Sequence, residues 1–225
     1  DEPTRCPYLP EQTARLPMRL PSRPLDRQQF ARRLEEGDRR QGLVLYRPSC
    51  PTCQACEPIR ILVEEFKPNK TQRRIWRRGH ERFEVQLATP TPSAEKVALY
   101  NRHKRGRALL GDGEEISSGG YDAFLVDSCT ESFELRYLSG GELIGVAVVD
   151  RAEDALSAVY TYFDPDHGRS SPGVFSILTQ LQLCKRWGLR YLYLGLYVGG
   201  CKAMEYKSKY TPHERRIDNA WRRFE

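Results

Sequence analysis

The stretch 133–163 decides the fold of this chain, and it runs FELRYLSGGELIGVAVVDRAEDALSAVYTYF. Runs rich in Val, Leu, Ile, Phe and Tyr recur three times within it, which predicts strands over 133–138, 142–149 and 156–163. Short segments containing Gly-Gly and Glu-Asp separate these runs, and such segments suit the tight turns of hairpins. The three strands are therefore expected to form an antiparallel meander.

The chain after residue 163 adds a helix, a strand and a further helix. Pro172 is tolerated in the first turn of a helix, and apolar residues follow at helical spacing, so a helix is predicted over 172–187. We expect a strand over 190–198 and a last helix over 202–210, followed by a polar tail. This order resembles the GNAT-like acyltransferase fold, so we expect an α+β class with a mainly antiparallel sheet and helices.

The chain before residue 110 is expected to form a smaller N-terminal α/β domain that carries a cysteine loop. Its predicted elements are a helix over 25–36, strands over 42–46 and 59–66, a short basic helix or turn over 69–79, a strand over 82–88, and a helix from Ser93 to 109. The glycine-rich loop over 111–120 is expected to be mobile and to order when substrate binds. We therefore predict an N-terminal domain over 1–110 and a GNAT-like domain over 111–225.

The charge of the chain is concentrated in one segment. The net charge is +6 over 225 residues, but residues 60–107 alone hold 13 basic and 5 acidic side chains. A local excess of this size suits a polyanionic partner such as nucleic acid, although a solvated basic face would give the same count. No apolar run is long enough to span a bilayer, and the first residues lack the apolar core of a signal peptide. We expect a cytoplasmic protein with reduced thiols and no membrane contact.

Three motifs carry a resemblance to a known family. They are CPYLP at 6–10, YRPSCPTCQACEPIR at 46–60 with FKPNKTQRR at 66–74, and GLYVGGCKAMEYK at 195–207. In this order they resemble the arginyl-tRNA–protein transferase superfamily, and most closely its bacterial branch of aspartate/glutamate leucyltransferases. The resemblance implies an aminoacyltransferase of the N-degron pathway of protein degradation. Such an enzyme moves leucine from leucyl-tRNA to an N-terminal Asp or Glu of an acceptor protein.

Other functions stay open at this stage. An arginyl-tRNA–protein transferase would carry the same motifs. A coenzyme A-dependent N-acetyltransferase would share the fold, but the segment 166–173 matches the usual coenzyme A loop poorly. A non-enzymatic zinc or iron–sulfur module that binds nucleic acid is the third alternative.

Four cysteines have the spacing of a metal or cluster site. Cys50, Cys53 and Cys56 form C-x-x-C-x-x-C, and Cys6 is available as a fourth ligand. Two-residue spacers let thiolates converge on zinc or an iron–sulfur cluster. Packed free thiols that tie the Cys6 arm to the loop are the alternative.

The chemistry of aminoacyl transfer needs few special groups. An aminoacyl ester is already activated and an α-amine has a neutral fraction near pH 7, so no cofactor is required for transfer. The reaction is expected at the opening between the strands 156–163 and 190–198. Asp164, Tyr162 and Tyr206 are the catalytic candidates there, with Asp164 holding or deprotonating the amine. A turn role before Pro165 is the alternative for Asp164.

Basic side chains are assigned to the two substrates. Arg47, Lys70, Arg73 and Arg74 are the candidates for binding the acceptor carboxylate, because Arg offers a planar fork and Lys a point charge. Contact with tRNA phosphates is an equal alternative for these four residues. The candidates for tRNA binding itself are Arg77, Arg78, Arg82, Lys104, Arg105, Arg107, Lys202 and Lys207.

Overall fold

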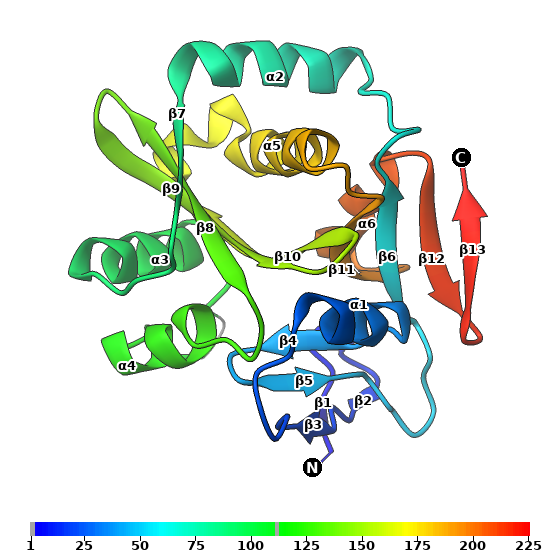
Figure 1. The fold of residues 1–225 in the computed structure, drawn as a ribbon. Helices are drawn as coiled ribbons and strands as arrows, with labels where there is room; N and C mark the ends of the chain where they lie inside the picture. Colours follow the sequence, from blue (N-terminus) through cyan, green and yellow to red (C-terminus); the bar gives the residue numbers. More distant parts are fainter. Residues whose placement is uncertain (1–2, 111–112) are drawn as a thin grey trace.

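An eight-stranded sheet forms the centre of the molecule, as a computed structural model of the chain describes it for residues 3–110 and 113–225 (Figure 1). The strands lie in the order β13 (Ala220–Phe224), β12 (His213–Ile217), β6 (Cys56–Leu62), β11 (Tyr191–Val198), β10 (Ala155–Phe163), β9 (Glu142–Arg151), β8 (Ser132–Ser139) and β7 (Glu84–Ala88). Neighbouring strands pair antiparallel except β10 and β11, which are parallel. The predicted meander is β8–β9–β10, and with it the α+β class and the GNAT-like order are confirmed.

Helices cover both faces of this sheet (Figure 1). On one face lie α2 (Lys70–Arg82) and α5 (Pro172–Arg186), and on the other lie α1 (Arg27–Glu35), α3 (Ala94–Gly106) and α4 (Ser118–Tyr121). The alternation of side chains along β11 reflects this arrangement, because Leu192 packs in the core under α5 while Tyr193 packs with Phe30 and Leu34 of α1.

The contact between α2 and α5 depends on one glycine. Asn69 caps α2 by accepting from the Gln72 backbone N–H, and Gln72 bonds back to Asn69, so a capping box fixes the start of the helix. The segment predicted as a short helix or turn is thus a helix of 13 residues. A Cβ at Gly79 would lie 2.1 Å from the ring of Phe175 in α5. Only glycine lets the two helices approach this closely.

The N-terminal part of the chain builds a small sheet beside α1. It has the order β3 (Met18–Arg19), β5 (Val44–Tyr46) and β4 (Arg39–Gln41), and a two-stranded sheet of β1 (Thr4–Arg5) and β2 (Thr13–Ala14) lies next to it in Figure 1. Strands β6 and β7 also come from before residue 110, yet they belong to the large sheet. A separate N-terminal domain and the division at residue 110 therefore stay predictions.

Three expectations differ from the structure. The polar tail is wrong: residues 213–224 form the hairpin β12–β13, and Asp218 and Asn219 both have positive φ, as a two-residue hairpin turn requires. The last helix is shorter than predicted, since α6 covers Lys202–Glu205 and a 3₁₀ turn covers Tyr206–Lys209. Residues 118–121 of the predicted glycine-rich loop form α4, and residues 111 and 112 lie outside the described residues. Within the two described ranges, no helix has both the length and the apolar character needed to cross a bilayer.

Candidate active site

The two parallel strands separate at the centre of the sheet. Residues 155–157 of β10 pair with 191–193 of β11, and no pairing follows beyond them. Further along, β10 stays bonded to β9 as far as Phe163, and β11 stays bonded to β6 as far as Val198. The strands therefore diverge toward their C-terminal ends. The opening that this creates lies where the sequence placed the reaction.

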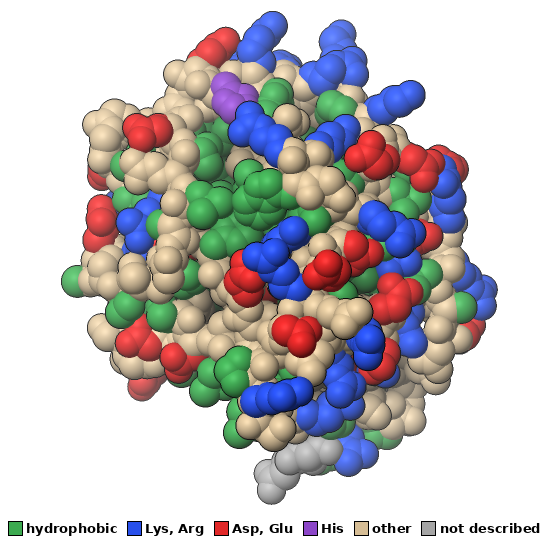
Figure 2. All heavy atoms as spheres, in the orientation of Figure 1, with side chains coloured by type: hydrophobic (Ala, Val, Ile, Leu, Met, Phe, Trp, Pro, Cys, Tyr) green, Lys and Arg blue, Asp and Glu red, His purple; other side chains and the backbone are tan. Residues whose placement is uncertain are grey.

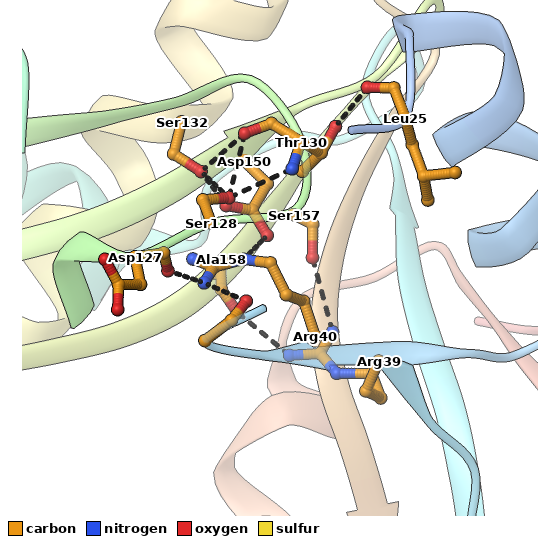
Figure 3. A network of polar contacts seen from close by, with 11 residues as sticks. Leu25, Arg39, Arg40, Asp127, Ser128, Thr130, Ser132, Asp150, Ser157 and Ala158 are labelled. Carbon is orange, nitrogen blue, oxygen red and sulfur yellow. Dashed lines mark hydrogen bonds and ion pairs between the residues drawn. The ribbon is translucent and has the colours of Figure 1, made fainter. Parts of the chain in front are cut away.

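A buried arginine from the small sheet occupies the base of this opening. The guanidinium of Arg39 in β4 donates to the carbonyl oxygen of Ala158 at 3.0 Å and to Ser157 Oγ at 3.5 Å, as Figure 3 shows. Across the opening, β11 has Gly195 with φ +85°, and a Cβ there would lie 3.0 Å from Arg39 Nη2. Glycine at this position leaves the space that the guanidinium fills.

Lys207 enters the same opening from the 3₁₀ turn after β11. Its Nζ donates to the carbonyl oxygen of Leu196 at 2.5 Å and lies 3.1 Å from Met204 Sδ. Burial, together with the positive charge of Arg39, lowers the pKa of the Lys207 ammonium to about 7. Arg39 and Lys207 are therefore neighbouring buried cations.

The cysteine loop closes one side of the opening. Burial, together with the nearby thiols of Cys50, Cys6, Cys53 and Cys201, raises the pKa of the Cys56 thiol to about 12. The structure thus brings the Cys6 arm to the loop, and all seven cysteines are free thiols.

The described thiols do not form a metal site as they stand. Among residues 3–110 and 113–225, no group of three or more His, Cys, Asp or Glu side chains is arranged to hold a metal ion. Zinc or an iron–sulfur cluster at Cys6, Cys50, Cys53 and Cys56 therefore stays a prediction.

The opposite side of the opening is aromatic and basic. Arg107, the residue that ends α3, places its guanidinium 5.6 Å from the ring centre of Phe163. Burial raises the pKa of the hydroxyls of Tyr160 and Tyr206, and the charge of Arg107 partly offsets that rise for both. Arg107 therefore lies near one tyrosine of β10 and one tyrosine of the 3₁₀ turn that follows β11.

Two of the predicted catalytic residues, Tyr162 and Asp164, make structural contacts with other residues of the protein. The hydroxyl of Tyr162 lies 2.5 Å from the hydroxyl of Tyr121 in α4, and both side chains are fully buried in a cluster with residues of α3. Asp164 accepts from the backbone N–H of Asp166 at 3.0 Å and pairs with Arg102 at 2.7 Å. This geometry matches the turn role considered for Asp164. Tyr206 is the predicted catalytic residue that faces the opening.

The predicted acceptor-binding residues lie on opposite faces of the sheet. Arg47 follows β5 and pairs with Asp38 at 2.9 Å and with Glu36 at 3.4 Å. Lys70, Arg73 and Arg74 belong to α2, on the far face. The four side chains therefore do not converge on one carboxylate.

The predicted tRNA-binding residues fall into three groups. Arg77, Arg78 and Arg82 are exposed on α2, and Figure 2 shows basic side chains gathered at the top of the molecule, where Figure 1 draws α2. Lys104, Arg105 and Arg107 lie at the end of α3. Lys202 is exposed on α6, whereas Lys207 is buried.

One short segment connects the first two of these groups. It is the 3₁₀ turn η2 (Pro165–Ser170), which directly follows β10. Arg82 donates to Ser170 Oγ at 2.8 Å, and a Cβ at Gly106 of α3 would touch the Pro165 ring. The basic ends of α2 and α3 thus meet beside the opening.

Comparison with known proteins identifies the family. The family model described as arginine-tRNA-protein transferase, C terminus, matches residues 95–217, and the N-terminus model of that family matches residues 4–74. This chain belongs to the arginine-tRNA-protein transferase family. It is therefore a transferase enzyme, as the sequence motifs predicted.

Relatives of this transferase cover nearly its whole length. An aspartate/glutamate leucyltransferase of Chromobacterium violaceum is 37% identical over 97% of this chain and 90% of its own length. The enzyme of that name from Acinetobacter baumannii is 39% identical over 98% of this chain and 82% of its own. Among solved structures, the crystal structure of FemX has a TM-score of 0.51 at 8% identity, covering 79% of this chain and 63% of that one. At that identity the likeness concerns the fold alone.

Sequence analysis missed the two arginines that connect the small sheet to the large one. Arg40 donates to Asp150 in β9 at 2.7 Å, and Arg39 reaches β10, so consecutive residues of β4 both point into the transferase (Figure 3). In the sequence, Arg39 and Arg40 follow a predicted helix and precede a predicted strand, where two adjacent arginines are typical of a solvent-exposed turn. No local pattern distinguishes that case from a buried one.

Proposed function

We propose that this transferase moves leucine from leucyl-tRNA to the N-terminal Asp or Glu of acceptor proteins. The proposal depends mainly on one observation: relatives that are 36–39% identical over nearly the whole chain are named aspartate/glutamate leucyltransferases. The reaction is expected in the cytoplasm, where charged tRNA is found.

The chemistry requires a shielded place where the two substrates meet. The α-amine nitrogen of the acceptor attacks the ester carbonyl carbon of leucyl-tRNA, and a peptide C–N bond forms. The ester C–O bond to the terminal ribose then breaks, the amine loses a proton, and the ribose oxygen gains one. The opening between β10 and β11 supplies such a place, because the unpaired edges of both strands line it. Positioning of two reactants in such a site provides much of the rate enhancement.

Arg107 and the tyrosines near it are the groups that suit the donor end. Arg107 is exposed and lies beside Phe163. Its positive charge lowers the pKa of the Tyr160 and Tyr206 hydroxyls, which burial raises. A guanidinium in this place can bind the terminal phosphate of the tRNA while the tyrosine hydroxyls bind ribose or ester oxygens. Tyr206 keeps its predicted place in the site on this proposal.

The outer basic residues suit the body of the tRNA. The cations Lys70, Arg73, Arg74, Arg77, Arg78 and Arg82 are exposed on α2. They form one basic helix face, which leads through η2 to the end of α3 and the opening. Phosphate contacts of this kind position a nucleic acid without reading its sequence. On this proposal Lys70, Arg73 and Arg74 bind tRNA rather than the acceptor carboxylate.

The cysteine loop is a separate proposal. If Cys6, Cys50, Cys53 and Cys56 hold zinc or a cluster, the metal would hold the N-terminal arm against β6, and no step of the transfer passes through it. Elemental analysis of anaerobically purified protein tests this point. Protein that is active without zinc or iron would leave packing of free thiols as the role of the loop.

The proposed function has a direct test. Purified protein is incubated with leucyl-tRNA and peptides that start with Asp, Glu or Asn, and the products are read by mass spectrometry. A leucyl adduct is expected on the Asp and Glu peptides and should disappear when ribonuclease is added first. Acetylation of the same peptides by acetyl-coenzyme A without tRNA would instead support the acetyltransferase alternative.

A further inference from the structure

The buried cations of this protein fall into two classes. Five Lys and Arg residues of the described chain are at least nine-tenths buried: Arg39, Arg40, Arg60, Lys96 and Lys207. A buried positive charge is costly unless a negative charge lies next to it. Any such residue without a carboxylate partner therefore calls for an explanation.

Three of the five have carboxylate partners. Arg40 pairs with Asp150 at 2.7 Å, and Lys96 pairs with Glu134 at 2.5 Å. Arg60 pairs with Glu214 at 2.7 Å. In these places the fold itself supplies the compensating charge.

The other two cations have none. Across residues 3–110 and 113–225, neither Arg39 nor Lys207 takes part in an ion pair, and each is 7% exposed. Their hydrogen bonds go to uncharged groups, which are the carbonyl oxygens of Ala158 and Leu196, Ser157 Oγ and the Met204 sulfur. Both cations face the same opening. Two adjacent buried basic groups thus lie together without an anion.

We propose that Arg39 and Lys207 bind the side-chain carboxylate of the acceptor's N-terminal Asp or Glu, an inference that rests on the proposed function. The carboxylate supplies the negative charge that the fold leaves out. Arg39 contributes a planar fork and Lys207 a point charge, which together can hold both oxygens of a carboxylate. Selection of acidic over amide side chains then follows from charge.

The burial of Arg39 and Lys207 favours an acceptor carboxylate over a tRNA phosphate as their bound anion. A phosphate of the tRNA backbone carries bulky neighbours on both sides, whereas an Asp or Glu side chain is slender. Tyr8 lies near Arg39, and Cys201 and the Tyr206 ring lie near Lys207; all three side chains are at least partly exposed. A narrow acidic side chain can pass between them to a cation that is 7% exposed.

The role also predicts an effect on stability. Lys207→Met keeps the length of the side chain and removes a buried amine that has no carboxylate partner. If Lys207 serves substrate binding, this variant should unfold at the same temperature as the original protein or a higher one. Lys96→Met is the matched control, because it removes a buried lysine that is paired with Glu134. The control should lose stability and keep its preference for acidic peptides.

The decisive measurement is kcat/KM for peptides that start with Asp and with Asn, using leucyl-tRNA as donor. Lys207→Met should lower the Asp-to-Asn ratio by about ten- to hundredfold, mainly through KM for the Asp peptide. KM for leucyl-tRNA should stay the same. Arg39→Gln should give the same loss, and Lys207→Arg, which keeps the charge, should retain the preference.

The outcomes are separable. If the original protein transfers no leucine to any peptide, the proposed function fails. If it prefers Asp while Lys207→Met and Arg39→Gln keep that preference, the carboxylate site is wrong. If Lys207→Met and Arg39→Gln lower kcat equally for Asp and Asn peptides, Arg39 and Lys207 act on the ester of leucyl-tRNA and not on the acceptor carboxylate. This result would also overturn the proposal. Should Lys207→Met fail to fold, Arg39→Gln and Lys207→Arg carry the test.

Discussion

Asp150→Asn should destabilise this protein far more than a typical point mutation. Arg40 Nε lies 2.7 Å from Asp150 Oδ2, and the two side chains are 1% and 0% exposed. The amide keeps the size of Asp150 but leaves the buried charge of Arg40 without a carboxylate. Breaking a buried pair in this way costs about 3–5 kcal/mol of the free energy of unfolding. For a chain of this length that corresponds to a fall in Tm of roughly 6–20 °C.

The same pair connects the fold to the site. Arg40 also donates to the carbonyl oxygens of Gly42 and Asp127, at 3.1 and 3.0 Å, so it holds β4 against the large sheet (Figure 3). Arg39 is the preceding residue of β4. A change that loosens Arg40 should therefore shift Arg39 in the opening and raise KM for acidic acceptors in the protein that remains folded.

Urea unfolding measures the effect on stability. The midpoint should fall while the slope stays constant, since the surface exposed on unfolding changes little. Asp154→Asn is the control, because Asp154 and Arg190 form an exposed pair at 3.8 Å and should matter by less than about 1 kcal/mol. The double variant Arg40→Met, Asp150→Leu should lose less stability than the two single variants added together. A cost below about 1 kcal/mol for Asp150→Asn would refute the reasoning about buried pairs.

Three further predictions concern packing, pH and salt. Gly79→Ala should lower stability by about 1–3 kcal/mol despite the better helix propensity of Ala, because its Cβ would meet the Phe175 ring at 2.1 Å; unchanged urea unfolding would contradict this. Burial, helped by a neighbouring guanidinium, lowers the pKa of His213 below 6.5. As the pH drops below about 6.5, His213 therefore takes up a proton more readily in the unfolded chain than in the folded protein. The free energy of unfolding should then fall by at most about 1.4 kcal/mol per pH unit. His213→Gln should flatten that slope, which pH-dependent urea melts can check. Replacing Arg77 and Arg78 with Ala should weaken tRNA binding and reduce its dependence on salt, and an unchanged slope of log Kd against log salt would move the tRNA surface elsewhere.

Sequence patterns predicted the centre of the fold because that part is governed by local rules. The stretch 133–163 forms β8, β9 and β10, since alternating apolar runs and tight turns determine a meander with little help from distant residues. The helix predicted over 172–187 is α5, which ends one residue earlier. The family and its activity class followed from three motifs that are far apart in the chain.

The candidate site was predicted in part. The divergence of β10 and β11 agrees with the expected opening, because it follows from the order of the strands, while the catalytic role of Tyr206 stays a prediction. Arg39 could not be found in this way, since its burial depends on side-chain hydrogen bonds to Ser157 and Ala158 of β10, which lie far away in the sequence. Lys207 was predicted to bind tRNA as one of the basic side chains of the sequence. Only the packing around Leu196 makes it a buried cation.

Competition between two donors tests the central claim most directly. The protein is given equal amounts of leucyl-tRNA and arginyl-tRNA together with a peptide that starts with Asp, and mass spectrometry identifies the residue added. Leucine should be added in large excess, and prior treatment with ribonuclease should abolish the product. Addition of arginine instead, or of neither residue while both donors remain charged, would contradict the account.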